Sequence, residues 1–116
     1  MQLTLVTRIK EGILVVECSG RIVFGDESIR LRDTIKELIS QNNRIVLNLA
    51  QVTYIDSVGL GTLVALYTTA NKGGGSIKLA NLTKRVGDLL QVTKLLTVFE
   101  VFDSEQKAID SFKNAA

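Results

Sequence analysis

The segment at residues 55–61 reads Ile-Asp-Ser-Val-Gly-Leu-Gly and places a carboxylate beside a hydroxyl, at Asp56 and Ser57. Asp and Ser are both preferred helix N-caps, because their side-chain oxygens accept hydrogen bonds from the free amides of the first turn. A serine at a helix N-terminus is also well placed for phosphorylation, since free amides and the helix dipole can accommodate a phosphate. The segment therefore has two interpretations, a structural helix cap and a phosphorylation site at Ser57.

Two glycines follow this pair, Gly59 and Gly61. Inside a helix each costs roughly 1 kcal/mol relative to Ala. Placed in the first turns, they are expected to leave the helix end bare and open to close approach by another chain. We therefore predict a partner-binding surface made of Asp56, Ser57, Val58, Gly59, Leu60 and Gly61. A phosphate on Ser57 would add about −1.5 to −2 charges beside Asp56, and like-charge repulsion would then disturb a docked partner.

The composition argues against catalysis. The 116 residues include no histidine and a single cysteine, Cys18. Histidine is the usual general base, a common metal ligand and the usual partner of a serine or cysteine nucleophile. We expect no catalytic residues, no metal and no cofactor, and hence a protein that is not an enzyme. One cysteine allows no disulfide within the chain and indicates a cytoplasmic location.

Charge and hydropathy exclude other classes of partner. The net charge is +2, the basic residues are scattered and aromatic residues are few, so we expect no nucleic-acid binding. No apolar stretch approaches the roughly 20 residues needed to cross a bilayer, and the N-terminus does not resemble a secretory signal, so we expect no membrane insertion. We expect a monomer or a weak dimer, and the sequence leaves open whether the first hairpin edge pairs with another chain.

Apolar periodicity predicts the elements that must position the pair. Strands are expected from residue 3, at 13–18 with closure at Gly20, at 45–49, at 77–80 and at 98–102. Helices are expected around 29–39, at 58–71, around 86–90 and around 108–112. A hairpin turn is expected at residues 11–12, and residues 22–24 form a short strand or an extended lead-in. Candidate caps are Asp26 or Ser28, Asn81 or Thr83, and Asp103 or Ser104, with a left-handed exit of the first helix at Asn42 or Asn43.

This order predicts an α/β fold in a single domain over residues 1–116. Strands that alternate with helices favour a mostly parallel sheet covered by helices, and the first two strands add an antiparallel N-terminal hairpin. Functional sites in such sheets collect at the carboxyl ends of the strands. Asp56 and Ser57 come just past one of these ends.

The chain resembles a known family in these residues and over almost its whole length. Leu47-Asn48-Leu49 and Val52-Thr53-Tyr54-Ile55-Asp56-Ser57-x-Gly59-Leu60-Gly61 are similar to the signature of the STAS domain (sulphate transporter and anti-sigma factor antagonist). Gly73-Gly74 before a strand, Asn81-Leu82-Thr83 and residues 95–99 are similar to the C-terminal half of that domain. The length resembles that of free-standing bacterial anti-sigma factor antagonists.

The resemblance implies a phosphorylation switch. In the family, the unphosphorylated antagonist binds an anti-sigma factor serine kinase and frees its sigma factor. The kinase then phosphorylates the serine after the aspartate, here Ser57, the complex separates, and a phosphatase resets the switch. Asp56 would shape the docking surface and orient the serine, while Val58 replaces a second hydroxyl residue of some relatives.

Two alternatives to this switch stay open. STAS-like modules also serve as non-phosphorylated scaffold subunits of stress-sensing or lipid-transport ATPase assemblies. An enzyme or a nucleotide-binding domain of similar topology is the third hypothesis, and it lacks a visible catalytic cluster.

One segment departs from the family pattern. Many relatives carry Gly-x-Leu-Asp after the second strand, whereas residues 20–27 here read Gly-Arg-Ile-Val-Phe-Gly-Asp-Glu. Asp26 is the candidate to take the place of the missing aspartate from a longer loop; otherwise kinase recognition differs. Lys84, Arg85 and Lys94 form either a solvated face or a basic rim that steers an acidic partner.

Overall fold

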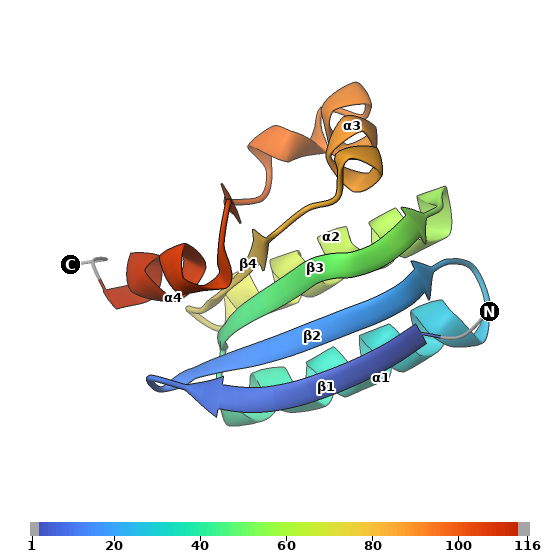
Figure 1. Ribbon diagram of the computed structural model, residues 1–116. Helices are drawn as coiled ribbons and strands as arrows, with labels where there is room; N and C mark the ends of the chain where they lie inside the picture. The colour runs from blue at the N-terminus through green and yellow to red at the C-terminus, as the bar shows by residue number, and fades with distance from the viewer. Residues whose placement is uncertain (1–2, 114–116) are drawn as a thin grey trace.

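Five strands make one mixed sheet in the computed structural model, which describes residues 3–113 (Figure 1). They are β1 (Leu3–Lys10), β2 (Ile13–Ile22), β3 (Arg44–Ile55), β4 (Ser76–Ala80) and β5 (Val101–Phe102), hydrogen-bonded in that order. β1 is antiparallel to β2, and every other neighbouring pair is parallel. The predicted α/β class, the mostly parallel sheet and the antiparallel N-terminal hairpin are confirmed.

Helices cover both faces of this sheet. They are α1 (Asp26–Gln41), α2 (Ser57–Lys72), α3 (Lys84–Val92) and α4 (Glu105–Lys113), with one 3-10 turn at Leu95–Thr97. α1 and α2 lie side by side behind the sheet, whereas α4 lies against the opposite face near β4 and β5 (Figure 1). α3 stands beside the carboxyl-terminal part of β3, at the same end of the molecule as the start of α2.

The central strand β3 is buried on both faces, as its continuous apolar run predicts. Ile45, Leu47 and Leu49 point into the larger core under α1 and α2. Val46 points the other way, into the smaller core under α4. This two-sided burial holds β3 rigidly in place, and β3 leads directly to the Asp56–Ser57 pair.

The hairpin turn at residues 11–12 is confirmed. Glu11 and Gly12 both have positive φ, 54° and 80°, which is the conformation of the tight turns that match the twist of a hairpin. β2 continues two residues beyond Gly20, where we expected it to end. Gly20, at φ 113°, precedes an irregularity in the pairing with β3, so a bulge carries the strand on rather than closing it.

The expected last strand, residues 98–102, is wrong in its first half. Val98 closes the 3-10 turn by donating its amide to the Leu95 carbonyl at 3.0 Å. Phe99 is buried, and its ring meets Tyr67 of α2 edge-on with centroids 5.2 Å apart. Only Val101–Phe102 pairs with β4, because the preceding residues leave the strand direction and place Phe99 in the core.

The capping residues of α1 differ from the prediction. Gly25 occupies the N-cap position with φ 110° and supplies no side-chain cap, while Asp26 is the first helical residue. Ser28 is buried and donates its hydroxyl to the Val23 carbonyl at 2.6 Å. At the other end Asn42 is extended, with φ −158°, so the left-handed exit is also wrong.

The other two caps fall on predicted candidates. Thr83 caps α3 by accepting a hydrogen bond from the Val86 amide at 3.3 Å. The Ser104 hydroxyl accepts from the Lys107 amide at 3.1 Å, at the start of α4. In both cases a hydroxyl satisfies a donor that the first helical turn leaves free.

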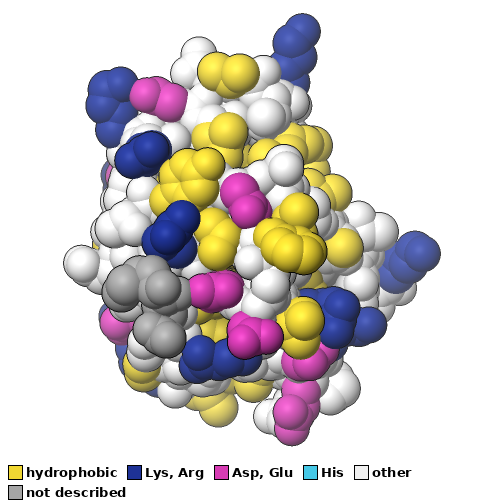
Figure 2. All heavy atoms as spheres, turned by 90° about the vertical axis from the view of Figure 1, so that its right-hand side faces the viewer, with side chains coloured by type: hydrophobic (Ala, Val, Ile, Leu, Met, Phe, Trp, Pro, Cys, Tyr) yellow, Lys and Arg dark blue, Asp and Glu magenta, His cyan; other side chains and the backbone are white. Residues whose placement is uncertain are grey.

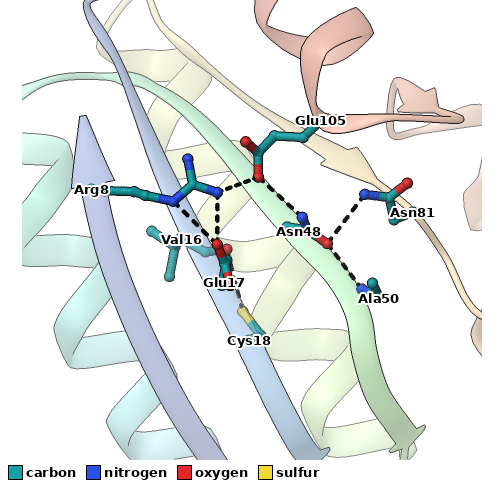
Figure 3. A network of polar contacts seen from close by, with 8 residues as sticks. All are labelled: Arg8, Val16, Glu17, Cys18, Asn48, Ala50, Asn81 and Glu105. Atoms are coloured by element: carbon teal, nitrogen blue, oxygen red, sulfur yellow. Dashed lines mark hydrogen bonds and ion pairs between the residues drawn. The ribbon is translucent and has the colours of Figure 1, made fainter. Parts of the chain in front are cut away.

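A polar network fastens α4 to the open face of the sheet (Figure 3). Arg8 of β1 reaches Glu17 and Glu105 at 2.7 Å each, and Asn48 of β3 donates to Glu105 at 3.1 Å. Burial alone would raise the pKa of the Glu105 carboxyl, but these hydrogen bonds and nearby positive charges hold the pKa below its ordinary value. The face opposite α1 and α2 therefore holds α4 through this polar network as well as through the smaller apolar core.

Candidate functional site

Asp56 joins three segments where β3 passes into α2. It occupies the N-cap position, and its Oδ1 accepts a hydrogen bond from the Gly59 amide at 2.8 Å. Its Oδ2 accepts from the Phe24 amide at 2.9 Å, and its own amide donates to the Ile22 carbonyl at 3.2 Å. The helix-cap interpretation is confirmed, and the carboxylate also holds the loop between β2 and α1 against the start of α2.

The Asp56 carboxyl is kept ionised by these contacts. Partial burial would by itself raise its pKa, but the amides of Phe24, Gly59 and Val58 and the charge of Arg21 outweigh burial. The pKa of Asp56 is therefore held below its ordinary value. A negative charge is a fixed feature of this end of α2.

The amides of the first turn of α2 are not all free, contrary to the expectation from sequence. The Gly59 amide is bound to Asp56, and the Val58 amide also points to that carboxylate. The Leu60 amide donates to the Asp56 carbonyl at 2.9 Å. A phosphate on Ser57 would therefore need most of its hydrogen-bond donors from elsewhere.

The Ser57 side chain is accessible. Ser57 is the first residue of α2 and is exposed. None of the hydrogen bonds found among residues 3–113 involves its hydroxyl, which leaves the oxygen available to an incoming group. Val58, 43% exposed, and Gly61 share this outer side of the helix start.

Gly59 and Leu60 lie on the inner side of the same turn and are buried. A Cβ on Gly59 would lie 2.0 Å from the Ile22 carbonyl oxygen, so the end of β2 already occupies the space beside this glycine. The expectation that the glycine admits another chain is wrong for Gly59. At Gly61 a Cβ would meet nothing within 4 Å, so the space beside this glycine is open, and its contact with a partner stays a prediction.

The loop before α1 contacts Asp56 through the Phe24 amide, and the role of Asp26 in the docking surface stays a prediction. Phe24 is 75% exposed, and its amide contact with Asp56 holds it beside the start of α2. Asp26 is exposed at the first position of α1, and its carboxylate makes none of the hydrogen bonds or ion pairs within the described residues. Phe24 was not among the predicted site residues, because its link to Asp56 is made by the backbone amide and depends on the fold.

A mostly apolar groove of about 370 Å³ runs from the start of α2 to α3. Its apolar wall consists of Tyr54, Ile55, Leu60, Leu89 and Val92, and Ser57 lies at its side. Val92 is 80% exposed. Figure 2 views this end of the molecule, and hydrophobic side chains gather at its centre and continue toward α3, with charged side chains around them.

Arg85 lines this groove, and Arg21 lines a neighbouring hollow that also includes Arg85 and Tyr54. The Arg21 and Arg85 guanidinium carbons lie 5.5 and 5.0 Å from the centre of the Tyr54 ring, within reach of cation–π attraction. Of the predicted basic rim, Arg85 lines the groove with Ser57, whereas Lys84 is 89% exposed and paired with Asp88 at 2.8 Å. Arg21 comes from the end of β2 and was not among the predicted site residues.

Within residues 3–113, no three His, Cys, Asp or Glu side chains are grouped as a metal ion requires. No helix in the same part of the chain has the length and apolar character to cross a membrane.

Comparison with known proteins decides the family. Residues 4–108 match the STAS domain. The chain belongs to the STAS domain family. The predicted resemblance is confirmed, and the Asp56–Ser57 pair lies inside the matched region.

Several curated relatives of this STAS chain are named as antagonists. The chain is 35% identical over 71 residues to an anti-sigma-B factor antagonist of Bacillus subtilis, covering 61% of this chain and 65% of that protein. It is 29% identical over 100 residues to an anti-sigma F factor antagonist of Paenibacillus polymyxa, covering 84% and 85%. It is also 30% identical over 88 residues to a STAS-domain containing protein of Pseudomonas aeruginosa, covering 76% and 86%.

Solved structures confirm the STAS fold. An anti-sigma factor antagonist from Mycobacterium paratuberculosis superimposes with a TM-score of 0.84 at 22% identity, covering 97% of this chain and 96% of that one. The Bacillus protein SpoIIAA in its phosphorylated form gives a TM-score of 0.70 at 20% identity, covering 95% and 98%. At these identities the likeness concerns the arrangement of the sheet and helices.

Proposed function

We propose that this STAS domain is a cytoplasmic anti-sigma factor antagonist whose binding to an anti-sigma factor serine kinase is controlled by phosphorylation at Ser57. The observation that carries the proposal is the position of Ser57, exposed at the first residue of α2 on a cap fixed by Asp56. The names of the B. subtilis and P. polymyxa relatives support the antagonist role. A phosphatase that acts on phospho-Ser57 would return the protein to its binding form.

The unphosphorylated protein offers the kinase a surface that is ready to dock. Phe24, Val58 and Gly61 expose apolar or bare backbone surface around the Ser57 hydroxyl. Asp56, Gly59 and Leu60 support that surface from below, and Asp26 adds a negative charge on the α1 side. Little reorganisation is needed for binding because the cap contacts already hold these segments together.

Phosphorylation would reverse this fit by adding charge to the centre of the surface. The phosphate carries about −1.5 to −2 charges at neutral pH. It would stand next to Asp56, which is already held in its ionised form. A partner that buries Val58 and Phe24 would then have to desolvate two neighbouring negative groups, which is strongly unfavourable.

The assignment is tested by phosphorylation in vitro. The purified chain is incubated with its cognate kinase and ATP, and the modified residue is located by mass spectrometry. Ser57→Ala should accept no phosphate, whereas Ser40→Ala, which alters an exposed serine in the last turn of α1, should behave like the wild type. Equal phosphate incorporation into wild type and Ser57→Ala would show that the assigned residue is wrong.

Binding measurements test the switch itself. Ser57→Ala should keep the affinity of the unphosphorylated protein for the kinase, and phosphorylated wild type should lose it. Ser57→Asp should weaken the complex only partly, because a carboxylate supplies less charge and fewer acceptor oxygens than a phosphate. A complex that survives phosphorylation would refute the switch and favour the scaffold-subunit role.

A further inference from the structure

The start of α2 cannot by itself neutralise a phosphate on Ser57. The Asp56 carboxylate accepts a hydrogen bond from the Gly59 amide at 2.8 Å and also interacts with the Val58 amide. Its negative charge lies on the residue next to Ser57. The usual anion site at a helix N-terminus depends on amides that are free to point at the ligand. Positive groups outside the helix must therefore determine where the phosphate settles.

Two guanidinium groups are available for this purpose. Arg21 and Arg85 both lie over Tyr54, and they line a common hollow with Thr53. Neither arginine takes part in any of the ion pairs formed within residues 3–113. Arg85 also lines the groove that contains Ser57, so one group faces both hollows.

Other charged groups near the site are already engaged or turned away. Lys84, the neighbour of Arg85, is paired with Asp88 at 2.8 Å and is absent from the lining of the groove. Asp88 lines the groove, but this ion pair offsets its charge. The cationic side chains that line the groove or the adjoining hollow are Arg21 and Arg85, and neither forms an ion pair within residues 3–113.

We propose that Arg21 and Arg85 form a subsite for the phosphate of phospho-Ser57 and connect the start of α2 to the end of β2 and the start of α3. The proposal rests on the proposed function in one respect, the assignment of Ser57 as the phosphorylated residue. A guanidinium matches the geometry of a phosphate with two parallel hydrogen bonds, and such charge-assisted bonds are roughly twice as strong as neutral ones. Cation–π contact with the Tyr54 ring holds both guanidinium groups in place before the phosphate arrives.

This subsite gives phosphorylation a second effect on a partner. A phosphate that bridges Ser57 and Arg85 would lie across the side of the groove whose wall includes Leu60 and Leu89. A partner side chain seated in that groove would be excluded by occupancy as well as by charge. In the phosphorylated form the groove would then be blocked by the phosphate, in addition to the repulsion that the added charge causes.

The test uses a chain that carries phosphoserine at position 57 by incorporation during translation, so no kinase is involved. The second pKa of the phosphate, near 6 for a free phosphoserine, is followed by phosphorus NMR during a pH titration. Engagement by arginine stabilises the dianion, so the wild-type phosphate pKa should lie roughly half a unit to one unit below that of Arg85→Gln. Arg21→Gln should likewise raise the phosphate pKa above the wild-type value.

Lys94→Gln is the matched control, because it removes one positive charge just after α3 from an exposed side chain that forms none of the ion pairs within residues 3–113 and does not line the groove. It should leave the phosphate pKa close to the wild-type value. Equal phosphate pKa values in wild type, Arg21→Gln and Arg85→Gln would overturn the subsite and assign the phosphate to solvent. An equal shift in Lys94→Gln would also overturn it, because the effect would then come from the general positive charge at this end of the molecule.

A second arm separates the tethered phosphate from a free one. Inorganic phosphate is added to the unphosphorylated chain while the arginine side-chain NMR signals are recorded. Millimolar phosphate should shift the Arg21 and Arg85 signals only weakly, whereas phosphoserine at position 57 should shift them fully, since a short tether supplies a high effective concentration. Strong binding of free phosphate with no effect of phosphoserine would overturn the proposal.

The outcomes also separate this inference from the proposed function. A kinase that ignores Ser57 refutes the proposed function but leaves the pKa difference intact. A missing pKa difference in a chain that the kinase phosphorylates normally refutes the subsite alone.

Discussion

Replacing Gly59 by alanine would place a methyl group against the end of β2. The new Cβ would lie 2.0 Å from the Ile22 carbonyl oxygen and 2.7 Å from its carbonyl carbon. Both are backbone atoms of a strand residue that pairs with Ile55 of β3, so they cannot rotate out of the way as a side chain can. The Ile22 carbonyl also accepts the Asp56 amide at 3.2 Å, and this hydrogen bond would be strained by any shift.

The expected cost follows from these contacts. Overpacking in a well-packed region costs about 1–3 kcal/mol, and a weakened hydrogen bond adds about 1 kcal/mol. Alanine regains roughly 1 kcal/mol through its better helix propensity. Gly59→Ala should therefore lower the free energy of unfolding by about 1–3 kcal/mol, a large part of the 5–15 kcal/mol typical of a domain.

Gly61→Ala is the control in the same helix. Its Cβ would meet nothing within 4 Å, so only the gain in helix propensity remains, about 0.5–1 kcal/mol of added stability. Urea unfolding followed by far-UV circular dichroism would measure both variants. The two free energies of unfolding should differ by about 1.5–4 kcal/mol, as the sum of these opposite effects. Equal stability of the two variants would refute the close approach of Ile22 to α2.

Two further predictions concern titratable groups. The pKa of Asp56 in the folded protein lies below its ordinary value. The ionised carboxylate therefore stabilises the fold fully when the pH is above the ordinary pKa, and this contribution is lost as the pH falls through the folded-state pKa. Asp56→Asn, which keeps a capping side chain but cannot titrate, should therefore lose less unfolding free energy than wild type between about pH 5 and pH 3 in urea titrations. Cys18 is 1% exposed, and burial raises its pKa to about 12. A thiol reagent at mildly alkaline pH should label Cys18 only when denaturant is added, and rapid labelling of the folded protein would contradict this burial.

The fold was predictable where one segment carries its own signal. The continuous apolar run at 45–49 indicates a strand buried on two faces, and Glu11-Gly12 indicates a hairpin turn. Residues 98–102 carry an equally good strand pattern, yet only the last two pair with β4. The strand is shorter than its pattern predicts because the Phe99 ring packs against Tyr67, more than thirty positions away in the sequence. A local sequence pattern does not contain that contact.

The site was predictable by residue type but not by contact. Asp and Ser after a strand indicate a helix cap, and the cap is there. The amide of Phe24 binds Asp56 across 32 positions of sequence, and the arginines meet on Tyr54 only because the end of β2 and the start of α3 fold to the same place. Both contacts depend on how distant segments come together in the fold, so the sequence could suggest neither.

The residues of the short motif at 56–61 fall into two groups, one that faces the protein interior and one that faces outward. Asp56, Gly59 and Leu60 face the protein, and each has a structural reason to be what it is: a cap, a close approach to Ile22 and a place in the core. Ser57, Val58 and Gly61 face outward, and nothing in the packing of the fold requires them.

The inward set would be needed in any STAS domain built this way, whether or not a kinase acts on it. The outward set is where a phosphorylated switch and an unmodified scaffold subunit must differ. Evidence for the switch therefore has to come from Ser57 and from the groups that surround it in space, Phe24 and Arg85 among them, rather than from the part of the motif that stabilises the helix. This is why the phosphate subsite bears on function more directly than the family signature does.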